Sequence, residues 1–244
     1  MKIGIIGSGN IGAELARKLS AAGHTVKLAN SRGPESLKDI VHGTAISAVA
    51  KDEVAKDAEV VILSIPFARN AEAAALVAQA PASTIFVDTS NYYPQRDGRI
   101  VEVESGKPET VWAREQIGRP LVKAWNAILS QTLVEAGAAP GTPDRIAIPI
   151  AGDDLAAKRV VADLVSATGF DAVDAGELAD SWKFQPGSPA YCTELTIEKL
   201  EAALSNASKE RSPANRDAIM KAISDGIVPM TRAAMAANNR VMSN

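Results

Sequence analysis

Short apolar runs and amphipathic stretches alternate along the chain as far as residue 175. The apolar runs are typical of buried parallel strands, and the stretches between them repeat apolar residues at helical spacing. Strands are predicted at residues 2–6, 25–29, 44–47, 59–65, 83–88, 121–125, 145–151 and 170–174. This alternation predicts a doubly wound α/β fold, with a mostly parallel sheet and helices on both faces.

The pattern changes after Gly176, where only helical periodicity remains. Helices are predicted at residues 10–19, 48–57, 70–79 and 153–167, the last one capped by Asp153, and then at 193–208, 213–224 and 227–239. Turn-forming residues indicate loops at 91–98 and 185–189. We therefore divide the chain into an α/β domain, residues 1–176, and a C-terminal helical extension, residues 177–244.

A glycine motif separates the first predicted strand from the first predicted helix. Gly-x-Gly-x-x-Gly is formed by Gly7, Ser8, Gly9, Asn10, Ile11 and Gly12. In dinucleotide-binding folds the first glycine permits a tight turn, the second lets the pyrophosphate approach the backbone, and the third lets the helix pack closely. Because strand, glycines and helix occur in this order, the motif predicts a Rossmann-type dinucleotide site. The alternative is a glycine turn that binds nothing.

The end of the second strand distinguishes NADP from NAD. An acidic residue there would bind the ribose 2'-hydroxyl of NAD, and none is present. Ser31 and Arg32 follow the strand instead, and an arginine fork matches the 2'-phosphate of NADP. These residues predict NADP(H) as the cofactor. Lys38 either adds positive charge or lies on a solvated helix face, and the alternative for Ser31 and Arg32 is a helix cap beside a surface arginine.

Composition and charge exclude several kinds of site. The 26 basic and 29 acidic residues give a net charge of -3, so no overall field attracts nucleic acid or an anionic membrane. Cys192 is the only cysteine, which excludes an internal disulfide and a cysteine metal cluster. His24 and His42 are too few for a metal site and are predicted at the surface. No apolar run reaches membrane-spanning length, and we expect a cytoplasmic protein without a metal.

Polar residues follow four predicted strands, at the edge where α/β sheets bind ligands. These endings are Ser64-Ile65-Pro66, residues 88–91, Trp125-Asn126-Ala127 and residues 174–176. Ordinary turn chemistry explains each ending alone, but together with the glycine loop they favour a cofactor site. Lys123 is the one candidate proton donor in this set. A strand lysine with a snorkelling head is the alternative, so the sequence assigns no catalytic residue.

Five segments together resemble one family. They are residues 1–12, Asn-Ser-Arg at 30–32, Leu-Ser-Ile-Pro at 63–66, Asp-Thr-Ser-Asn-Tyr-Tyr-Pro at 88–94 and Val-Lys-Ala-Trp-Asn at 122–126. They resemble the NADPH-dependent F420 reductases, in which a deazaflavin coenzyme exchanges a hydride with NADP, and whose dinucleotide domain is similar to the cytoplasmic domains of membrane metalloreductases. The resemblance implies pyrophosphate binding by residues 7–12 and 2'-phosphate binding by Ser31 and Arg32. It also implies a nicotinamide flanked by Ser64, Ile65, Pro66 and Asn126.

The small-molecule hydride acceptor is less well defined. Transfer to a flavin-like ring needs stacked rings, whereas reduction of a carbonyl also needs a proton donor, and no compelling donor is evident. We therefore expect a flavin- or deazaflavin-like acceptor, with coenzyme F420 or a flavin as candidates. One alternative is a β-hydroxyacid dehydrogenase, although the spacing from Lys123 to Asn126 differs from that class. The other alternative is an NADPH sensor without enzyme activity.

The helical extension carries more apolar faces than one sheet edge readily covers. They are formed by Leu195, Leu200, Leu204, Ile219, Met220, Ile223, Ile227, Met230 and Met235. We therefore predict that the extension closes the acceptor pocket and forms a homodimer. Trp182, Phe184 and Tyr191 either form the wall of that pocket or are purely structural.

Overall fold

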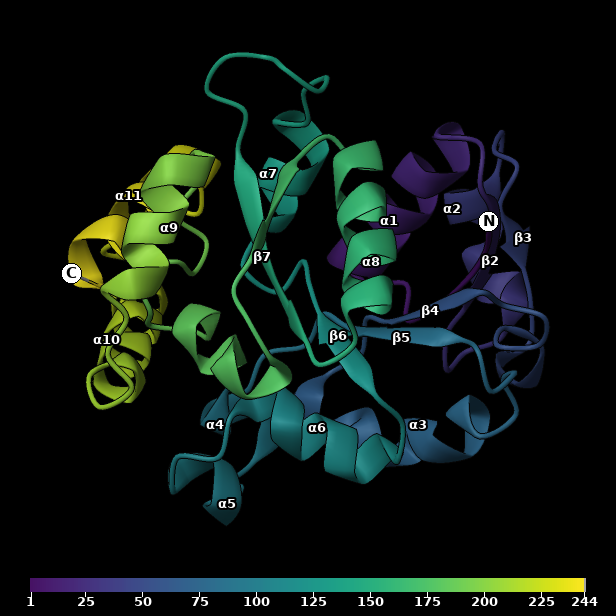
Figure 1. Ribbon diagram of the computed structural model, residues 1–244, viewed down its shortest axis with the longest axis horizontal. Coiled ribbons are helices and arrows are strands. Elements are labelled where there is room, and N and C mark those ends of the chain that lie inside the picture. The colour runs from purple at the N-terminus through teal and green to yellow at the C-terminus, as the bar shows by residue number, and fades with distance from the viewer. Residues whose placement is uncertain (244) are drawn as a thin grey trace.

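The computed structural model describes residues 1–243, which form an eight-stranded sheet with helices on both faces (Figure 1). The strands are β1 Lys2–Ile6, β2 Thr25–Ala29, β3 Ser47–Ala48, β4 Val60–Leu63, β5 Ile85–Asp88, β6 Leu121–Lys123, β7 Ala147–Gly152 and β8 Asp171–Asp174. Their spatial order is β3-β2-β1-β4-β5-β6-β7-β8. Neighbouring strands run parallel except β6 and β7, and the predicted doubly wound, mostly parallel sheet is confirmed.

The helices form a layer on each face of this sheet. They are α1 Asn10–Ala21, α2 Lys38–Val41, α3 Asn70–Val77, α4 Pro94–Asp97, α5 Val101–Glu104, α6 Glu109–Ile117, α7 Ser130–Glu135, α8 Leu155–Ala167, α9 Ile197–Ser205, α10 Ser212–Ser224 and α11 Arg232–Met242. Figure 1 shows α1 and α8 on one side of the sheet and α3 and α6 on the other. Short 3-10 helices lie at Pro34–Leu37, Lys51–Glu53, Phe67–Arg69 and Leu178–Phe184.

Two apolar layers hold the helices against the sheet. On one face Leu15 and Leu19 of α1 are fully buried in the same cluster as Ile5 of β1. On the other face Val77 of α3 and Ile117 of α6 belong to a second cluster. The apolar residues that repeat at helical spacing in the sequence therefore form the face of each helix that packs on the sheet. This packing holds the strand ends in fixed positions relative to one another.

The crossover between β3 and β4 is not the helix predicted at residues 48–57. It contains only the 3-10 helix Lys51–Glu53, and β3 begins three residues later than predicted. The physical reason lies at Gly4 of β1, where a Cβ would lie 2.3 Å from the carbonyl oxygen of Val54. The crossover backbone thus lies directly on the strand. A helix, whose axis stays about 8–10 Å from a packed neighbour, does not fit at that separation.

Other element boundaries also differ from the prediction. The segment predicted as a loop at 91–98 contains α4, and α5, α6 and α7 were not predicted. α6 buries polar residues, Glu109 among them, so its apolar period is weak. Asp154, and not Asp153, caps α8: its Oδ1 accepts the amides of Ala156 and Ala157 at 2.8 and 3.0 Å.

The reversal of direction at β7 moves one predicted strand ending away from the others. Lys123 of β6 pairs with Ala151 in antiparallel register, and β8 then follows β7 in parallel. The carboxyl end of β8 therefore lies at the opposite edge of the sheet from the ends of β4, β5 and β6. The prediction that residues 174–176 line the cofactor edge is wrong. Asp174 instead pairs with Lys158 at 2.8 Å.

The helical extension begins by packing on the sheet. Leu200 and Leu204 of α9 share a buried cluster with Val173 of β8. α10 and α11 lie beside α9 at the end of the molecule far from β3 (Figure 1). Ile227 and Met230, between α10 and α11, are 72% and 65% exposed. The sheet therefore covers only part of the apolar surface predicted for the extension.

Glu109 is, with Asp88, a buried acidic side chain of this scaffold. Glu109, at the start of α6, is 2% exposed, and its Oε2 accepts the amide N–H of Tyr92 at 3.0 Å. The amide of Glu109 donates to Oε1 of Gln185 at 3.1 Å. Burial raises the pKa of the Glu109 carboxyl from 4.5 to about 7, against the opposing effect of Lys123. The folded protein therefore binds a proton here that the unfolded chain releases at lower pH.

We predict that this carboxyl makes the protein less stable as pH rises. Between about pH 4.5 and 7 the folded state holds more protons than the unfolded state, so the free energy of unfolding falls through this window. Glu109→Gln removes this titration. The free energy of unfolding of the variant, compared with that of the unmodified protein at the same pH, therefore rises by up to a few kcal/mol from pH 5 to pH 8. Urea unfolding at several pH values measures this. Glu115→Gln, on the exposed face of the same helix, retains the decline, and an unchanged decline in Glu109→Gln contradicts the assignment.

Candidate functional site

The predicted glycine loop joins β1 to α1, and two of its glycines are required by packing. Gly7 has φ +109°, and a Cβ on it would lie 2.0 Å from the carbonyl oxygen of Ser64. A Cβ on Gly12 would lie 2.1 Å from the carbonyl oxygen of Gly7. A Cβ on Gly9, in contrast, has no protein atom within 4 Å. Gly9 therefore borders open space outside the loop, where the motif places a pyrophosphate.

The first turn of α1 suits an anion. Gly9 occupies the N-cap position without a side-chain cap, and the first turn contains no acidic residue. The first amides of a helix lack partners within it, and the helix dipole makes this end electropositive. The loop and helix together form the arrangement in which proteins hold phosphate groups.

Asn30 connects the glycine loop to the end of β2. Its side chain is buried, and Nδ2 donates to the hydroxyls of Ser8 and Ser36 at 3.0 and 2.9 Å. Its Oδ1 accepts the amide of Arg32 at 2.9 Å. Asn30 therefore fixes the turn that carries Ser31 and Arg32, whose side chains are both exposed. Ser31 does not cap a helix, because Gly33 is the N-cap residue of the following 3-10 helix.

These segments border a cleft of about 560 Å³, which we call the dinucleotide cleft. It is lined by residues 6–9, Ser31, Arg32 and residues 64–66. Lys51 also lines it, a residue that the sequence did not single out because the crossover after β3 was taken for a helix. Lys38 does not line the cleft and forms an exposed ion pair with Glu35.

A second cavity of about 350 Å³ continues from this cleft, and the two share Gly9 and residues 64–66. We call it the strand-end cavity, because it lies beyond the ends of β4, β5 and β6. Its lining includes Asn10, Ile11, Thr89, Ser90, Asn91, Arg96, Trp125, Asn126, Tyr191 and Cys192. The residues predicted to bind the cofactor at 7–12, 31–32, 64–66 and 126 all line one of the two cavities, except Gly12, which packs against Gly7.

Two asparagines join neighbouring strand ends at this cavity. Asn126 Nδ2 donates to Oδ1 of Asn91 at 3.1 Å and to the carbonyl of Phe184 at 3.0 Å. Asn91 Nδ2 donates in return to the carbonyl of Asn126 at 2.9 Å. The Oδ1 of Asn126 is buried without a hydrogen-bond partner. An unpaired buried acceptor costs about 1–3 kcal/mol, so this atom is a candidate acceptor for a ligand N–H group.

A buried ion pair supports the turn that follows β5. Lys123 Nζ lies 2.8 Å from Oδ2 of Asp88, and both side chains are fully buried. Lys123 also donates to the carbonyl oxygen of Ser90. Asp88 Oδ1 accepts the amide and the hydroxyl of Ser90 at 2.9 and 2.6 Å. Lys123 therefore neither snorkels nor lines either cavity, and it acts as a structural cation beneath the site.

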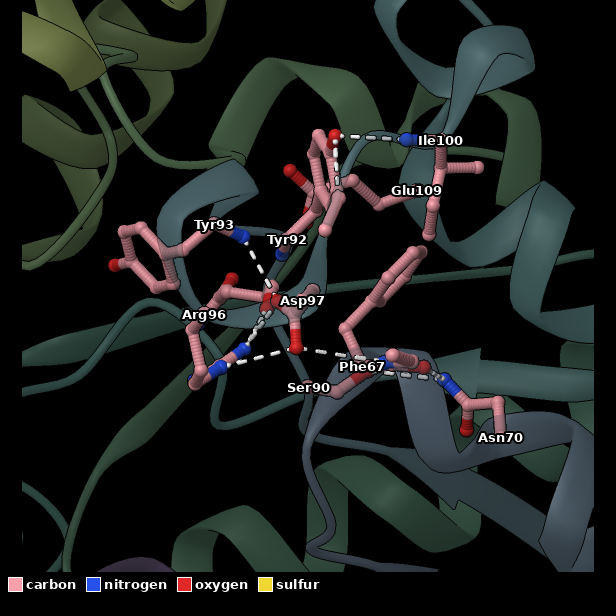
Figure 2. A network of polar contacts seen from close by, with 12 residues as sticks. Phe67, Asn70, Ser90, Tyr92, Tyr93, Arg96, Asp97, Ile100 and Glu109 are labelled. Carbon is pink, nitrogen blue, oxygen red and sulfur yellow. Dashed lines mark hydrogen bonds and ion pairs between the residues drawn. The ribbon is translucent and has the colours of Figure 1, made fainter.

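The chain after Ser90 places Tyr93 and Arg96 close together, beside the strand-end cavity (Figure 2). The hydroxyl of Tyr93 lies 2.6 Å from that of Tyr191. The guanidinium of Arg96 lies 5.2 Å from the centre of the Tyr93 ring and binds Asp97 through Nε and Nη2, at 3.0 and 2.7 Å. Burial raises the pKa of both tyrosines well above its usual value. The sequence predicted a loop here but gave Tyr93 and Arg96 no role in the site, because nothing local shows that this turn faces Tyr191.

The three aromatic residues predicted near the acceptor separate in the structure. Tyr191 lines the strand-end cavity, as one of the two interpretations requires. Phe184 is fully buried in the cluster beneath α9, and Trp182 borders a different cavity beside α10. Among residues 1–243, no helix has the length and apolar character to cross a membrane. The same part of the chain holds no group of three or more His, Cys, Asp or Glu side chains suited to a metal ion.

Comparisons with known proteins connect this site to a family. Residues 2–92 match the family model described as NADP oxidoreductase, coenzyme F420-dependent. A solved structure of the hypothetical protein SMa0349 from Sinorhizobium meliloti is 33% identical, with 74% of this chain and 87% of that chain covered and a TM-score of 0.62.

Two curated relatives match parts of the chain. Protein YjhV of Escherichia coli K12 is 41% identical over 69 residues, which are 28% of this chain and 50% of that protein. The metalloreductase STEAP3 of Rattus norvegicus is 29% identical over 180 residues, 74% of this chain and 35% of that protein. The chain thus spans half or less of the length of these two relatives.

The matched residues 2–92 contain the glycine loop, the turn at Ser31 and Arg32, and residues 64–66, and so include the whole lining of the dinucleotide cleft. The solved relative extends the similarity to most of the chain. The chain therefore belongs to the coenzyme F420-dependent NADP oxidoreductase family, one of the families of NAD(P)-dependent oxidoreductases.

Proposed function

We propose that the protein transfers a hydride between NADP(H) and a flavin- or deazaflavin-like acceptor. The observation that carries this proposal is the pair of joined cavities. One has a phosphate-binding loop and an arginine, and the other lies beyond the ends of β4, β5 and β6. Their shared border at Gly9 and residues 64–66 is where a dinucleotide would pass from its phosphates to its nicotinamide.

The charge of the dinucleotide cleft supports NADP(H) over NAD(H). Arg32 and Lys51 both line the cleft, and either cation favours a 2'-phosphate. The acid in the lining, Glu72, lies in the first turn of α3 rather than at the end of β2, and it pairs with Arg69 at 2.7 Å. We therefore assign the 2'-phosphate to the turn at Ser31 and Arg32.

The nicotinamide is assigned to the border between the two cavities, between residues 64–66 and Asn126. There the unpaired Oδ1 of Asn126 suits the carboxamide N–H of the ring. Bound NADPH supplies the hydride. The protein's own contribution is to hold the ring against the space that remains in the strand-end cavity, where a flat acceptor can stack.

A second candidate is reduction of a small oxo compound, as in the β-hydroxyacid dehydrogenases. The hydroxyl of Tyr191 favours it, because carbonyl reduction needs a proton donor and the sequence had indicated none. NADPH oxidation assayed with FMN, a deazaflavin and a panel of short 2-oxo acids separates the two candidates. Turnover of the oxo acids alone contradicts the flavin-like acceptor.

The helical extension is proposed to close the strand-end cavity. Cys192 and Glu194 both have φ +54°, a conformation uncommon for residues other than glycine. α11 holds this segment: Asn239 Nδ2 donates to the carbonyl of Cys192 at 3.2 Å, and Arg232 Nε donates to Glu194 at 2.6 Å. The cavity wall thus depends on the last helix. We also propose that the protein is a cytoplasmic homodimer.

Arg32→Ala is predicted to weaken NADPH binding by about 1.5–3 kcal/mol, the contribution of a hydrogen bond to a charged group, and to leave NADH binding nearly unchanged. Fluorescence titration with both cofactors measures the difference. Lys38→Ala removes a cation outside the cleft and should alter neither affinity. Equal losses of NADPH and NADH affinity in Arg32→Ala would contradict the assignment of the 2'-phosphate site.

Gly9→Val should abolish dinucleotide binding and leave the fold intact. The backbone of Gly9, with φ -70°, is open to any residue, and a Cβ there meets only the space proposed for the phosphates. Thermal melting should match that of the unmodified protein while NADPH titration shows no saturation. A folded Gly9→Val protein with normal NADPH affinity means that the loop is only a turn.

The exposed residues Ile227 and Met230 are predicted to form the subunit contact, because apolar side chains on the extension are stabilised by a symmetric partner. Light scattering at micromolar concentration should give a dimer, and Ile227→Asp combined with Met230→Asp should give a monomer. Val101→Asp, at an equally exposed position on α5, should remain a dimer. A monomeric unmodified protein shows that the extension serves its own subunit alone.

A further inference from the structure

We propose that Tyr191 donates the proton that accompanies hydride transfer, and that Tyr93 restores it. This inference rests on the proposed function, because it assigns a role within the strand-end cavity. Tyr191 lines that cavity, and Tyr93 lies behind it with the two hydroxyl oxygens 2.6 Å apart. The two residues are 98 positions apart in the sequence and meet only in the folded protein.

Hydrogen-bond counting leaves the proton of Tyr191 available to a ligand. A phenol has one hydrogen to donate and two lone pairs that accept. Asn91 Nδ2 donates to the Tyr191 oxygen at 3.2 Å, and Tyr93 can donate to it at 2.6 Å. With both lone pairs occupied, the hydroxyl hydrogen of Tyr191 is left to point toward the adjacent Cys192 sulfur or into the cavity that both residues line. The cavity that Tyr191 lines is where an acceptor would take it.

Charges around the pair support donation in the direction of reduction. Burial raises the pKa of Tyr191, which keeps the phenol protonated at neutral pH and makes it a weaker acid, so donation depends on the negative charge that develops on the acceptor. Burial also raises the pKa of the Cys192 thiol, to about 12, so no thiolate competes beside it. Arg96 lowers the pKa of Tyr93 through its positive charge, although burial dominates. The guanidinium therefore stabilises negative charge that reaches Tyr93.

Hydride transfer and proton transfer together reduce the acceptor by two electrons. The hydride from NADPH adds two electrons to the acceptor, which is reduced as NADPH is oxidised to NADP⁺. The O–H bond of Tyr191 breaks, and its proton passes to the ring nitrogen or carbonyl oxygen that gains electron density. Tyr93 then gives its proton to Tyr191. Because Tyr93 is partly exposed, it recovers a proton from water.

Three tyrosine-to-phenylalanine variants test the role. Tyr191→Phe should lower kcat for a deazaflavin or a 2-oxo acid by about 100-fold, the lower range for loss of a general acid, with unchanged NADPH affinity. It should also abolish the solvent deuterium isotope effect on kcat. Tyr93→Phe should lower kcat by about 10-fold. The matched control is Tyr92→Phe, whose hydroxyl bonds to Gly98 and Glu104 away from the cavity, and it should turn over normally.

A measurement without bound cofactor tests separately the proton relay, that is, the transfer of a proton from Tyr93 to Tyr191. In proton NMR of the unliganded protein, the short bond between the tyrosines should give a downfield hydroxyl resonance that disappears in Tyr191→Phe and in Tyr93→Phe. A resonance that persists in both variants overturns the relay. Full turnover by Tyr191→Phe overturns the proton donor and leaves the proposed function standing. An unmodified protein that binds NADPH tightly and reduces none of the acceptors overturns the proposed function, and this role with it.

Discussion

The buried pair of Lys123 and Asp88 is the interaction on which the rest of the site depends. Two charges are removed from water where β5 and β6 end, a cost of several kcal/mol per ion that only complete hydrogen bonding offsets. Here it is offset, because the lysine also binds the carbonyl of Ser90 while the aspartate binds the amide and hydroxyl of the same residue. Removing either partner leaves an unpaired buried charge, at a cost of roughly 3–5 kcal/mol. The pair thereby fixes the turn that follows β5.

From that turn the geometry of the site extends outward. Asn91 follows Ser90 directly, and its exchange of hydrogen bonds with Asn126 ties the end of β5 to that of β6. The same side chain reaches Tyr191, on a segment that returns to the sheet through the helical extension. Because β7 runs antiparallel to β6 and β8 follows it in parallel, β8 ends at the opposite edge of the sheet, and the following segment crosses back to bring Tyr191 to Asn91. Rigid strand ends therefore supply one wall of the strand-end cavity, and the extension supplies the other.

Features encoded within a few residues could be predicted from the sequence. The glycine loop, the absence of an acid after β2, and the apolar periods of the strands and of α1 are local, and the structure has them where they were expected. Features that depend on the direction of a strand, or on the distance between segments in the fold, could not be predicted from the sequence. No residue near β7 shows that it runs antiparallel, so residues 174–176 were placed at the wrong edge. The close approach of Val54 to Gly4 replaced a predicted helix with an irregular crossover.

The same distinction between local features and features of the fold applies to the roles of single side chains. The sequence left Lys123 open between a proton donor and a snorkelling strand lysine, and only the fold shows its carboxylate partner. Tyr93 and Tyr191 gave no joint signal, since their contact joins segments 98 positions apart. Lys51 was not singled out, because its place in the lining of the dinucleotide cleft depends on the irregular crossover after β3, which was predicted as a helix. Local chemistry thus indicated the glycine loop and the turn at Arg32, while the contacts around Tyr191 depend on tertiary structure.

A crystal structure of the protein soaked with NADPH is the most direct test of the central claim. We expect the pyrophosphate over Gly9 and the first turn of α1, the 2'-phosphate beside Arg32, and the nicotinamide between residues 64–66 and Asn126, with the carboxamide donating to Asn126 Oδ1. A dinucleotide bound with its nicotinamide outside the strand-end cavity, or with its 2'-phosphate away from Arg32, contradicts the account.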